Sequence, residues 1–225
     1  MLASNDLLVQ IVSELGQRVY SVDEAFKKLE QSARKTFSTS ELLGEIGEVS
    51  FQIALEEIVK DYGERVDLNP IADRSRTDHY FFHRDSAGRM VVYLGSGNHS
   101  EIDSIAVVDG LPVLFEIKMA TKRRAKSNQA NFGSRKINHQ ISTEGVYRRI
   151  HPVQEYFDTF DCGMVFVTLP ENLKHTSEAQ VEFKKNGGFL IPLYTDGEFR
   201  KEVEFYAKRY GVVENNTVRL NTVRR

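Results

Sequence analysis

The charged side chains within the apolar segment LPVLFEIKMA, residues 111–120, have types and spacing that could do chemistry. Glu116 and Lys118 stand two positions apart in a run that otherwise predicts a buried strand, and charged side chains are rarely buried without partners. Either this strand lies at the edge of a sheet with one face exposed to water, or its two charged side chains take part in a reaction.

A turn in the sequence brings a third charge to this pair. The Asp-Gly pair at 109–110 is typical of a two-residue hairpin turn. The register that such a turn imposes places Asp103 directly opposite Glu116, on the same face and with Cβ atoms about 5 Å apart. Lys118 lies two residues beyond Glu116 and therefore shares that face. The sequence thus predicts a cluster of two carboxylates and one lysine.

Two carboxylates this close repel each other, so the cluster needs a neutralising partner. A shared proton, the lysine or a divalent cation could provide it. Oxygen ligands suit Mg²⁺, with Mn²⁺ as a substitute, and such ions keep several waters that a phosphate can replace. The alternative is a satisfied salt bridge on a sheet face. Because the charges are embedded in an apolar hairpin, we favour the metal site.

A further carboxylate for such a site is available in the segment LLGEIGEV, within a predicted helix. Glu45 and Glu48 are three residues apart and are therefore neighbours on one helical face. Gly44 and Gly47 stand beside them, and glycine costs roughly 1 kcal/mol in a helix interior relative to alanine. The two glycines indicate that something approaches the helix backbone closely here. The alternative is that both glutamates simply face solvent.

The charge of the chain is distributed unevenly. Its formal net charge is −2, yet residues 118–150 contain nine Lys and Arg residues against Glu144 alone, a local charge of +8. A basic block in an otherwise acidic chain indicates a site for a polyanion, because contacts with phosphates release counterions. A solvated basic surface is the alternative. Composition alone does not decide between these two interpretations.

Size and composition indicate a globular protein. The chain has 225 residues, of which 40% are hydrophobic and 28% charged, enough for one large domain with its own core. A single cysteine excludes an internal disulfide and any cysteine-clustered metal site. The start MLASNDLL lacks the pattern of a signal peptide, and no run of about 18 apolar residues predicts a membrane span. We therefore expect a cytoplasmic protein with no membrane partner.

The elements that must position the charged cluster are predicted as an alternation of helices and strands. Residues 4–36 predict two short helices that break near 19–21, and a third helix starts at Ser38, which has capping-box spacing with Glu41. The later elements are strands at 79–83 and 89–95, the hairpin around 109–110, a helix over 134–150, a buried strand at 162–169, a helix at 176–187, a strand at 188–195 and an amphipathic helix at 197–211. This order predicts an α/β fold with helices on both faces of the sheet.

Asp103, the run Glu116-Ile117-Lys118 and the preceding helical Glu48 together resemble the PD-(D/E)XK nuclease superfamily. The segment IDSIAVVDGLPVLFEIK is most similar to the archaeal-type Holliday-junction resolvase branch, although Ile102 replaces the usual proline before the aspartate. The resemblance covers about 38–63 and 98–170. It implies a restriction-endonuclease-like, three-layer α/β/α fold with a central mixed β-sheet, an N-terminal helical extension over 1–37, a nuclease domain over 38–225 and a family-divergent insertion over 64–100.

The resemblance also implies roles for individual residues. Asp103 and Glu116 would hold the metal with the help of the Ile117 carbonyl, and Glu48 would be a further ligand. Lys118 would orient or deprotonate the attacking water and stabilise the transition state.

Contacts with DNA are implied for a second group of residues. Ser100 would touch the scissile phosphate, and Gln140 lies on the following helix, where a surface glutamine is the alternative. The remaining contacts would come from the basic block, at Lys122, Arg123, Arg124, Lys126, Arg135 and Lys136.

The expected function is therefore a Mg²⁺-dependent DNA endonuclease acting on duplex or branched DNA, with junction-resolvase-like cleavage as the narrower expectation. By analogy with relatives we also expect a homodimer. A non-catalytic nucleic-acid-binding module that retains the fold is the main alternative. A structural protein in which the cluster is only a salt-bridge network is a third, but it would leave the adjacent basic block unexplained.

Overall fold

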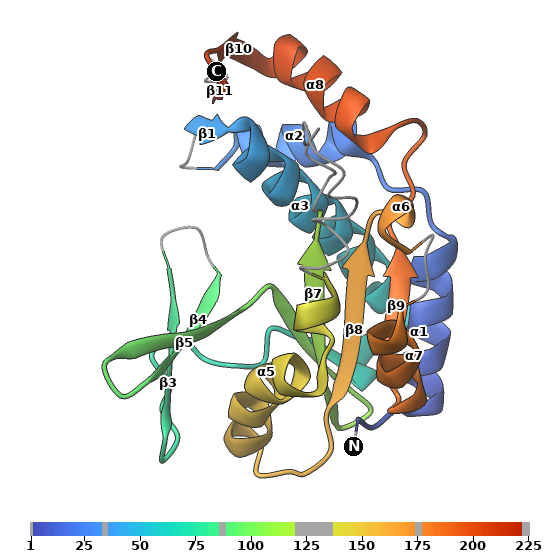
Figure 1. Ribbon diagram of the computed structural model, residues 1–225, viewed down its shortest axis with the longest axis vertical. Helices are drawn as coiled ribbons and strands as arrows, with labels where there is room; N and C mark the ends of the chain where they lie inside the picture. Colours follow the sequence, from blue (N-terminus) through green and yellow to red (C-terminus); the bar gives the residue numbers. More distant parts are fainter. Residues whose placement is uncertain (1, 33–35, 86–88, 120–136, 174–176, 222–225) are drawn as a thin grey trace.

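A five-stranded mixed sheet lies at the centre of the protein (Figure 1). The computed structural model describes residues 2–32, 36–85, 89–119, 137–173 and 177–221. The strand order is β2-β6-β7-β8-β9, with β6 antiparallel to both neighbours and β7, β8 and β9 mutually parallel. The strands are β2 (Val66–Leu68), β6 (Ser104–Val108), β7 (Leu111–Lys118), β8 (Gly163–Thr168) and β9 (Phe189–Pro192).

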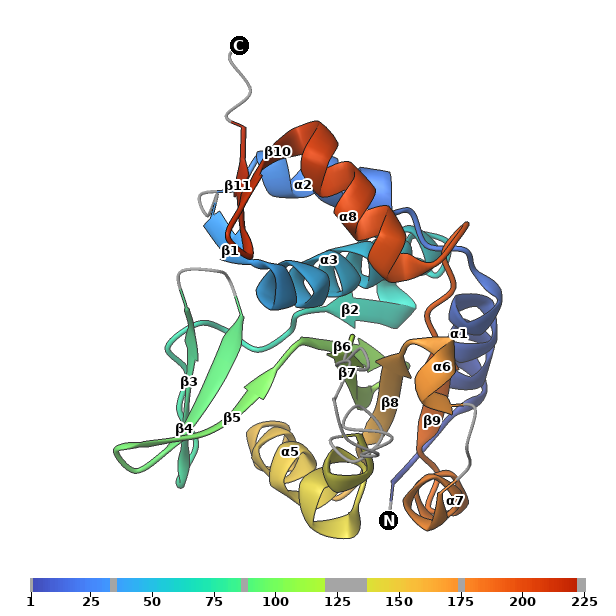
Figure 2. The ribbon, with the colours of Figure 1, turned by 45° about the horizontal axis from the view of Figure 1, so that its top comes forward.

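Helices cover both faces of this sheet, as the alternation of elements predicted (Figure 2). Val113, Phe115 and Ile117 of β7 pack against α1 and α3, whereas Leu114 packs against α5 and α7. The even-numbered side chains of β7 thus face the α5 layer. No helix in the described ranges is both long and apolar enough to cross a membrane. The helices are α1 (Asp6–Gln17), α3 (Thr39–Lys60), α5 (Thr143–Tyr156) and α7 (Glu178–Lys185).

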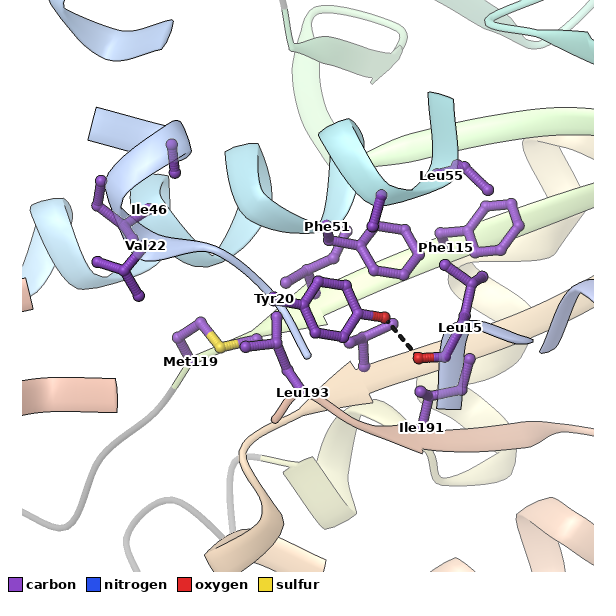
Figure 3. Close-up of a cluster of buried hydrophobic side chains, with 14 of the residues drawn as sticks. Leu15, Tyr20, Val22, Ile46, Phe51, Leu55, Phe115, Met119, Ile191 and Leu193 are labelled. Carbon is purple, nitrogen blue, oxygen red and sulfur yellow. Dashed lines mark hydrogen bonds between the residues drawn. The ribbon is translucent and has the colours of Figure 1, made fainter. Parts of the chain in front are cut away.

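The N-terminal segment is part of the main core. Helices α1 and α2 (Val22–Glu30) are separated by a break at the predicted place, and their apolar faces pack with the central sheet. Tyr20 lies in this break and is 2% exposed. Its ring stacks against Phe51 of α3 with 6.3 Å between centroids, and its hydroxyl donates a hydrogen bond to the Leu15 carbonyl at 2.9 Å (Figure 3). Helices α1 and α2 and the break between them therefore help to hold α3 on the sheet.

Helix α3 begins as the sequence predicted. Ser38 is the N-cap, and both hydrogen bonds of the capping box with Glu41 are present. The two glycines of this helix differ in their surroundings. A Cβ atom at Gly47 would collide with the side chain of Met119, which follows β7, whereas nothing lies within 4 Å of a Cβ at Gly44. The predicted close approach is confirmed at Gly47 and wrong at Gly44.

A separate three-stranded antiparallel sheet, β3-β4-β5, lies beside the central one (Figures 1 and 2). Its strands are β3 (Tyr80–Arg84), β4 (Met90–Leu94) and β5 (Gly97–Ile102), of which only the first two were predicted. The segment 64–100 also contains the short helix η1 (Gly63–Arg65) and β2, the edge strand of the central sheet. The chain passes from β5 into β6 through Asp103 alone, so this residue lies where the two sheets meet.

The helix predicted over 134–150 has different bounds. Residues 137–140 form a separate helical turn, and α5 begins only at Thr143, where the Ser142 side chain accepts a hydrogen bond from the Gly145 N–H. Helix α5 then continues to Tyr156 through Pro152. Ser142 is therefore the N-cap of α5, because its side chain satisfies a backbone N–H that would otherwise lack a partner.

Pro152 explains how α5 holds the β3-β4-β5 sheet. A proline has no N–H, so the carbonyl four residues earlier in a helix is left without its usual donor. In α5 this is the carbonyl of Arg148, and the His99 ring nitrogen Nε2 of β5 lies 3.0 Å from it. Because a carbonyl only accepts, Nε2 carries the proton. Arg148 Nε in turn donates to the His99 carbonyl at 2.8 Å.

The C-terminal part forms a third sheet that the sequence analysis missed, with strand order β1-β11-β10. Asn215 and Asn216 both have positive φ and form the tight turn between β10 and β11. The amphipathic helix α8 was predicted correctly and buries Phe199 and Val203. The remaining elements are α6 (Pro170–Leu173), α8 (Phe199–Tyr210), β1 (Thr36–Ser38), β10 (Gly211–Glu214) and β11 (Thr217–Leu220).

Candidate active site

The predicted hairpin register is confirmed. Residues 109–110 form the turn between β6 and β7, and both have positive φ, as a tight hairpin turn requires. The ladder pairs Val108 with Leu111 at one end and Ser104 with Phe115 at the other. The next position in this register would oppose Asp103 to Glu116. Asp103 does not continue the strand, because it lies in the bend that precedes β6.

Asp103, Glu116 and Lys118 meet at this end of the hairpin. The Lys118 Nζ atom lies 3.0 Å from Asp103 Oδ2 and 2.9 Å from Glu116 Oε1. The side chains of Asp103 and Glu116 are only 5% and 6% exposed, and that of Lys118 is 23% exposed. Of the three neutralising partners that the sequence left open, the structure shows the lysine between the two carboxylates.

The backbone of β7 also holds Asp103. The N–H of Ile117 donates to Asp103 Oδ2 at 2.8 Å, next to the hydrogen bond from Lys118 to the same oxygen. This side chain accepts a backbone N–H at the point where the strand pairing stops. The contact seen at Ile117 uses its N–H, whereas the resemblance assigned a role to its carbonyl.

Arg149 of α5 is a member of the cluster that the sequence analysis did not single out. Its side chain is 17% exposed, and its Nε atom lies 3.3 Å from Glu116 Oε1. Its Nη1 atom donates to the Gly145 carbonyl at 2.9 Å, which fixes the guanidinium along the helix. Two cations thus face the Glu116 carboxylate. Only the packing of α5 on the sheet brings Arg149 here, so no local pattern in the sequence could have identified it.

Glu48 of α3 borders the other side of Asp103. Glu48, Glu45 and Asp103 line a common pocket of about 220 Å³, together with Arg89 and Ser104. Burial first, and the nearby Asp103 carboxylate second, raise the pKa of Glu48 to about 8 against the opposing effect of Lys118. Its carboxyl is therefore largely protonated at neutral pH in the metal-free protein.

The pKa values of Glu116 and Lys118 are both raised. Burial raises the pKa of Glu116, and the Asp103 carboxylate adds to this effect, while Lys118 and Arg149 oppose it. Burial lowers the pKa of Lys118, but the attraction of Asp103 and Glu116 outweighs it, so the net shift is upward. Lys118 therefore keeps its positive charge at neutral pH.

A second pocket, of about 470 Å³, opens on the α5 side of the cluster and contains two of the predicted nucleic-acid contacts. Ser100 and Gln140 line it together with Glu116, Lys118 and Arg149. The other predicted contacts lie outside the described residues, namely Lys122, Arg123, Arg124, Lys126, Arg135 and Lys136.

The carboxylates are not arranged as a finished metal site. In the described part of the chain, no three or more His, Cys, Asp and Glu side chains are grouped as they would be around a metal ion. Lys118 accounts for this arrangement, because its ammonium lies between Asp103 and Glu116 and Glu48 faces the other pocket.

Comparisons with known proteins leave the family of this chain open. No protein-family model matches it, and no curated protein matches it either. The chain is similar to the crystal structure of protein VC1899 from Vibrio cholerae, with 15% identity and a TM-score of 0.31, over 93% of this chain and 57% of that one. This chain therefore spans little more than half of that protein. A similarity at this level supports no inference about fold or activity.

Proposed function

We propose that this protein is a divalent-metal-dependent DNA endonuclease that hydrolyses phosphodiester bonds at Asp103, Glu116 and Lys118. One observation carries the proposal: two almost fully buried carboxylates lie within 3.0 Å of one ammonium group, at the edge of a polar pocket. Buried ionisable groups with strongly shifted pKa values in a cleft are typical of active sites.

The proposal includes a restriction-endonuclease-like fold. The mixed central sheet with helices on both faces is compatible with it. The resemblance stated from the sequence assigned Asp103 and the Glu116-Ile117-Lys118 run to one site, and their contacts support that assignment. Duplex or branched DNA is the proposed partner, and a homodimer is proposed by analogy alone.

Mg²⁺, with Mn²⁺ as a substitute, is the proposed cofactor, and the donor atoms fit it. Asp103, Glu116 and Glu48 offer only carboxylate oxygens, the ligands that Mg²⁺ prefers. The pKa values of Glu48 and Glu116 are raised because burial disfavours their charged forms. A cation bound nearby would stabilise those charged forms. When bound, the ion would polarise the phosphoryl group and lower the pKa of a bound water.

The remaining chemistry falls to the chain itself. Because Lys118 stays charged at neutral pH, it is better suited to stabilise negative charge on the phosphate in the transition state than to remove a proton from water. The Ile117 N–H fixes the orientation of Asp103. Arg149 supplies a second positive charge at Glu116, on the side where the larger pocket opens.

The alternative is a non-catalytic nucleic-acid-binding module, and one observation favours it: Lys118 and Arg149 already neutralise the two carboxylates. Buried ion pairs of this kind contribute little net stability, however, because desolvation offsets their attraction. A module that only binds nucleic acid would also have no use for two carboxylates beside the phosphates of DNA, which they repel. We therefore place the catalytic function first.

Cleavage assays test the proposal. Supercoiled plasmid, linear duplex and a four-way junction are incubated with protein and Mg²⁺ or Mn²⁺, and Glu116→Gln is compared with Glu56→Gln. Glu56 is a suitable control because it forms an exposed ion pair with Lys28 at 3.1 Å, far from the cluster in sequence. We expect metal-dependent cleavage that Glu116→Gln abolishes and Glu56→Gln retains. DNA binding without cleavage under either metal would favour the alternative.

A further inference from the structure

The larger pocket beside the cluster has walls from three elements. Strand β5 contributes Ser100 and Glu101, the helical turn over 137–140 contributes Gln140, and α5 contributes Glu144 and Arg149. Glu116 and Lys118 lie at its inner end. Its volume, about 470 Å³, lies within the range of sites for small ligands, which is about 300–1,000 Å³. The pocket can therefore hold one ligand group next to the proposed reaction centre.

The walls of this pocket carry polar atoms without partners. Four buried side-chain atoms in the described residues have no hydrogen-bond partner, and three of them belong to residues that line this pocket: Ser100 Oγ, Gln140 Oε1 and Arg149 Nε. Of these three, Arg149 Nε is already in the 3.3 Å ion pair with Glu116 Oε1. The fourth is Ser104 Oγ, in the pocket on the Glu48 side. Buried polar groups are nearly always hydrogen-bonded. Ser100 Oγ and Gln140 Oε1 are therefore left without a partner in the protein, and a ligand in the pocket would complete their hydrogen bonds.

The chemistry of the walls restricts that ligand. Arg149 and Lys118 line the pocket, and although both are paired with Glu116, their remaining N–H donors favour an anionic group beside them. A phosphodiester group alone would not suit the rest of the wall, since Gln140 Oε1 and the carboxylates of Glu101 and Glu144 accept hydrogen bonds and a phosphodiester has no hydrogen-bond donor. The ligand must combine an anionic group with both donors and acceptors, as a nucleotide does.

One wall also offers a flat ring. His99 lines the pocket, and its imidazole contacts the tilted ring of Tyr80, with 5.2 Å between the ring centroids. Its Nε2 atom is fixed by the Arg148 carbonyl, and Tyr80 is fixed in turn by a 2.9 Å hydrogen bond to His151 Nδ1. Bases stack on such rings with little sequence preference. A rigid imidazole at the wall is therefore suited to the face of a base.

We infer that this pocket receives a single unpaired nucleotide of a DNA strand, with its phosphate toward Lys118 and Arg149 and its base edge toward Ser100 and Gln140. This inference rests on the proposed nuclease function and narrows its substrate class. A base within a duplex cannot enter such a pocket unless it leaves the stack, which is easiest at a position that is already unpaired. DNA with an unpaired nucleotide, as at a bulge, flap or single-stranded end, is therefore preferred over a perfect duplex.

Binding without metal tests this inference independently of cleavage. Fluorescence anisotropy in EDTA compares two labelled DNA duplexes of the same sequence, one perfect and one with a single unpaired nucleotide. We expect the wild-type protein to bind the second about tenfold more tightly. Ser100→Ala and Gln140→Leu should each remove most of this preference. Gln10→Leu, at an exposed position of α1, is the matched control and should keep it.

The outcomes separate this inference from the proposed function. Equal wild-type affinity for the two duplexes, or an equal preference in Gln140→Leu and Gln10→Leu, would overturn the nucleotide pocket. Cleavage of the same DNAs in Mn²⁺ is then measured. Cleavage without preference for the unpaired site would support the proposed nuclease function and contradict the proposed nucleotide pocket. Retained binding preference with no cleavage of any substrate would leave the pocket and reject the nuclease.

Discussion

Lys118 donates a hydrogen bond to Asp103 at 3.0 Å, although fifteen positions separate the two residues in the chain. The hairpin turn makes this contact possible, and the same ammonium lies 2.9 Å from Glu116. Both carboxylates are almost fully buried, so the lysine is what keeps them from repelling each other in the metal-free protein.

Removal of this ammonium should therefore destabilise the metal-free protein. Lys118→Met leaves two buried carboxylates facing each other, and loss of one partner of a buried ion pair costs about 3–5 kcal/mol. Urea unfolding at neutral pH in EDTA measures the change. Lys28→Met is the matched control, because Lys28 forms an exposed pair with Glu56, and it should change the stability by less than about 1 kcal/mol. Equal stability of both variants would contradict the buried cluster.

Glu48 should make the metal-free protein less stable as pH rises. Its pKa is about 8 in the folded protein against an ordinary value of 4.5, so the unfolded chain gives up this proton at lower pH. The neutral carboxyl stabilises the fold below pH 4.5, and this contribution is lost as pH rises through 8. The loss is on the order of 5 kcal/mol. Glu116 shifts in the same direction and adds to the slope.

The measurement is the free energy of unfolding between pH 5 and pH 9 in EDTA. Glu48→Gln carries no titrating group and should flatten the curve, so that the variant is more stable than the wild type at the upper end. Addition of Mg²⁺ should stabilise the wild type most at high pH, because the cation binds the carboxylate form. A wild-type curve that rises with pH over this range, as for an ordinary ion-paired carboxylate, would contradict the assignment.

Gly44 and Gly47 of α3 should respond differently to alanine. Nothing lies within 4 Å of a Cβ at Gly44, so Gly44→Ala should stabilise the protein by roughly 0.5–1 kcal/mol through helix propensity. A Cβ at Gly47 would collide with Met119, so Gly47→Ala should lose that gain and destabilise the protein by about 1 kcal/mol. Thermal unfolding compares the two. The double variant Gly47→Ala with Met119→Ala should be less destabilised than the sum of its single changes.

Pro152 should control how firmly β5 is attached to α5. Pro152→Ala restores an N–H that competes with His99 for the Arg148 carbonyl. We expect faster hydrogen exchange of the β5 amides in this variant, with little change in β8. His99→Ala should have the same effect, and the double variant should exchange no faster than either single one, since both break one contact. If the two changes accelerated hydrogen exchange of the β5 amides additively, Pro152 would act through a contact other than the one between His99 and the Arg148 carbonyl.

The sequence predicted the centre of the site because its geometry is local. The turn at 109–110 sets the register of β6 and β7, and this register alone brings Asp103, Glu116 and Lys118 to one place. The capping-box spacing of Ser38 and Glu41 likewise predicted the start of α3, and an amphipathic pattern predicted α8. The pair Asn215-Asn216 could have predicted the tight turn between β10 and β11, because asparagine tolerates positive φ, but this turn was not predicted.

Other parts of the site depend on contacts that no local pattern encodes. Arg149 reaches Glu116 only because α5 packs across the end of β7. The bounds of α5 were wrong since Ser142 can either continue a helix or cap one, and the packing of Gly145 against the His139 and Gln140 carbonyls decides for the cap. β5 was missed because its sequence, GNHSEI, is polar and lacks the alternation of a half-buried strand.

The most direct test of the central claim is the single-turnover rate of strand cleavage by wild type and Lys118→Met, both with saturating Mn²⁺ and an end-labelled DNA with one unpaired nucleotide. Lys28→Met is measured alongside as the control. The account predicts metal-dependent cleavage by wild type and Lys28→Met, and at least a hundredfold slower cleavage by Lys118→Met, about 2.7 kcal/mol in the barrier. Equal rates for wild type and Lys118→Met, with the variant folded, would contradict it.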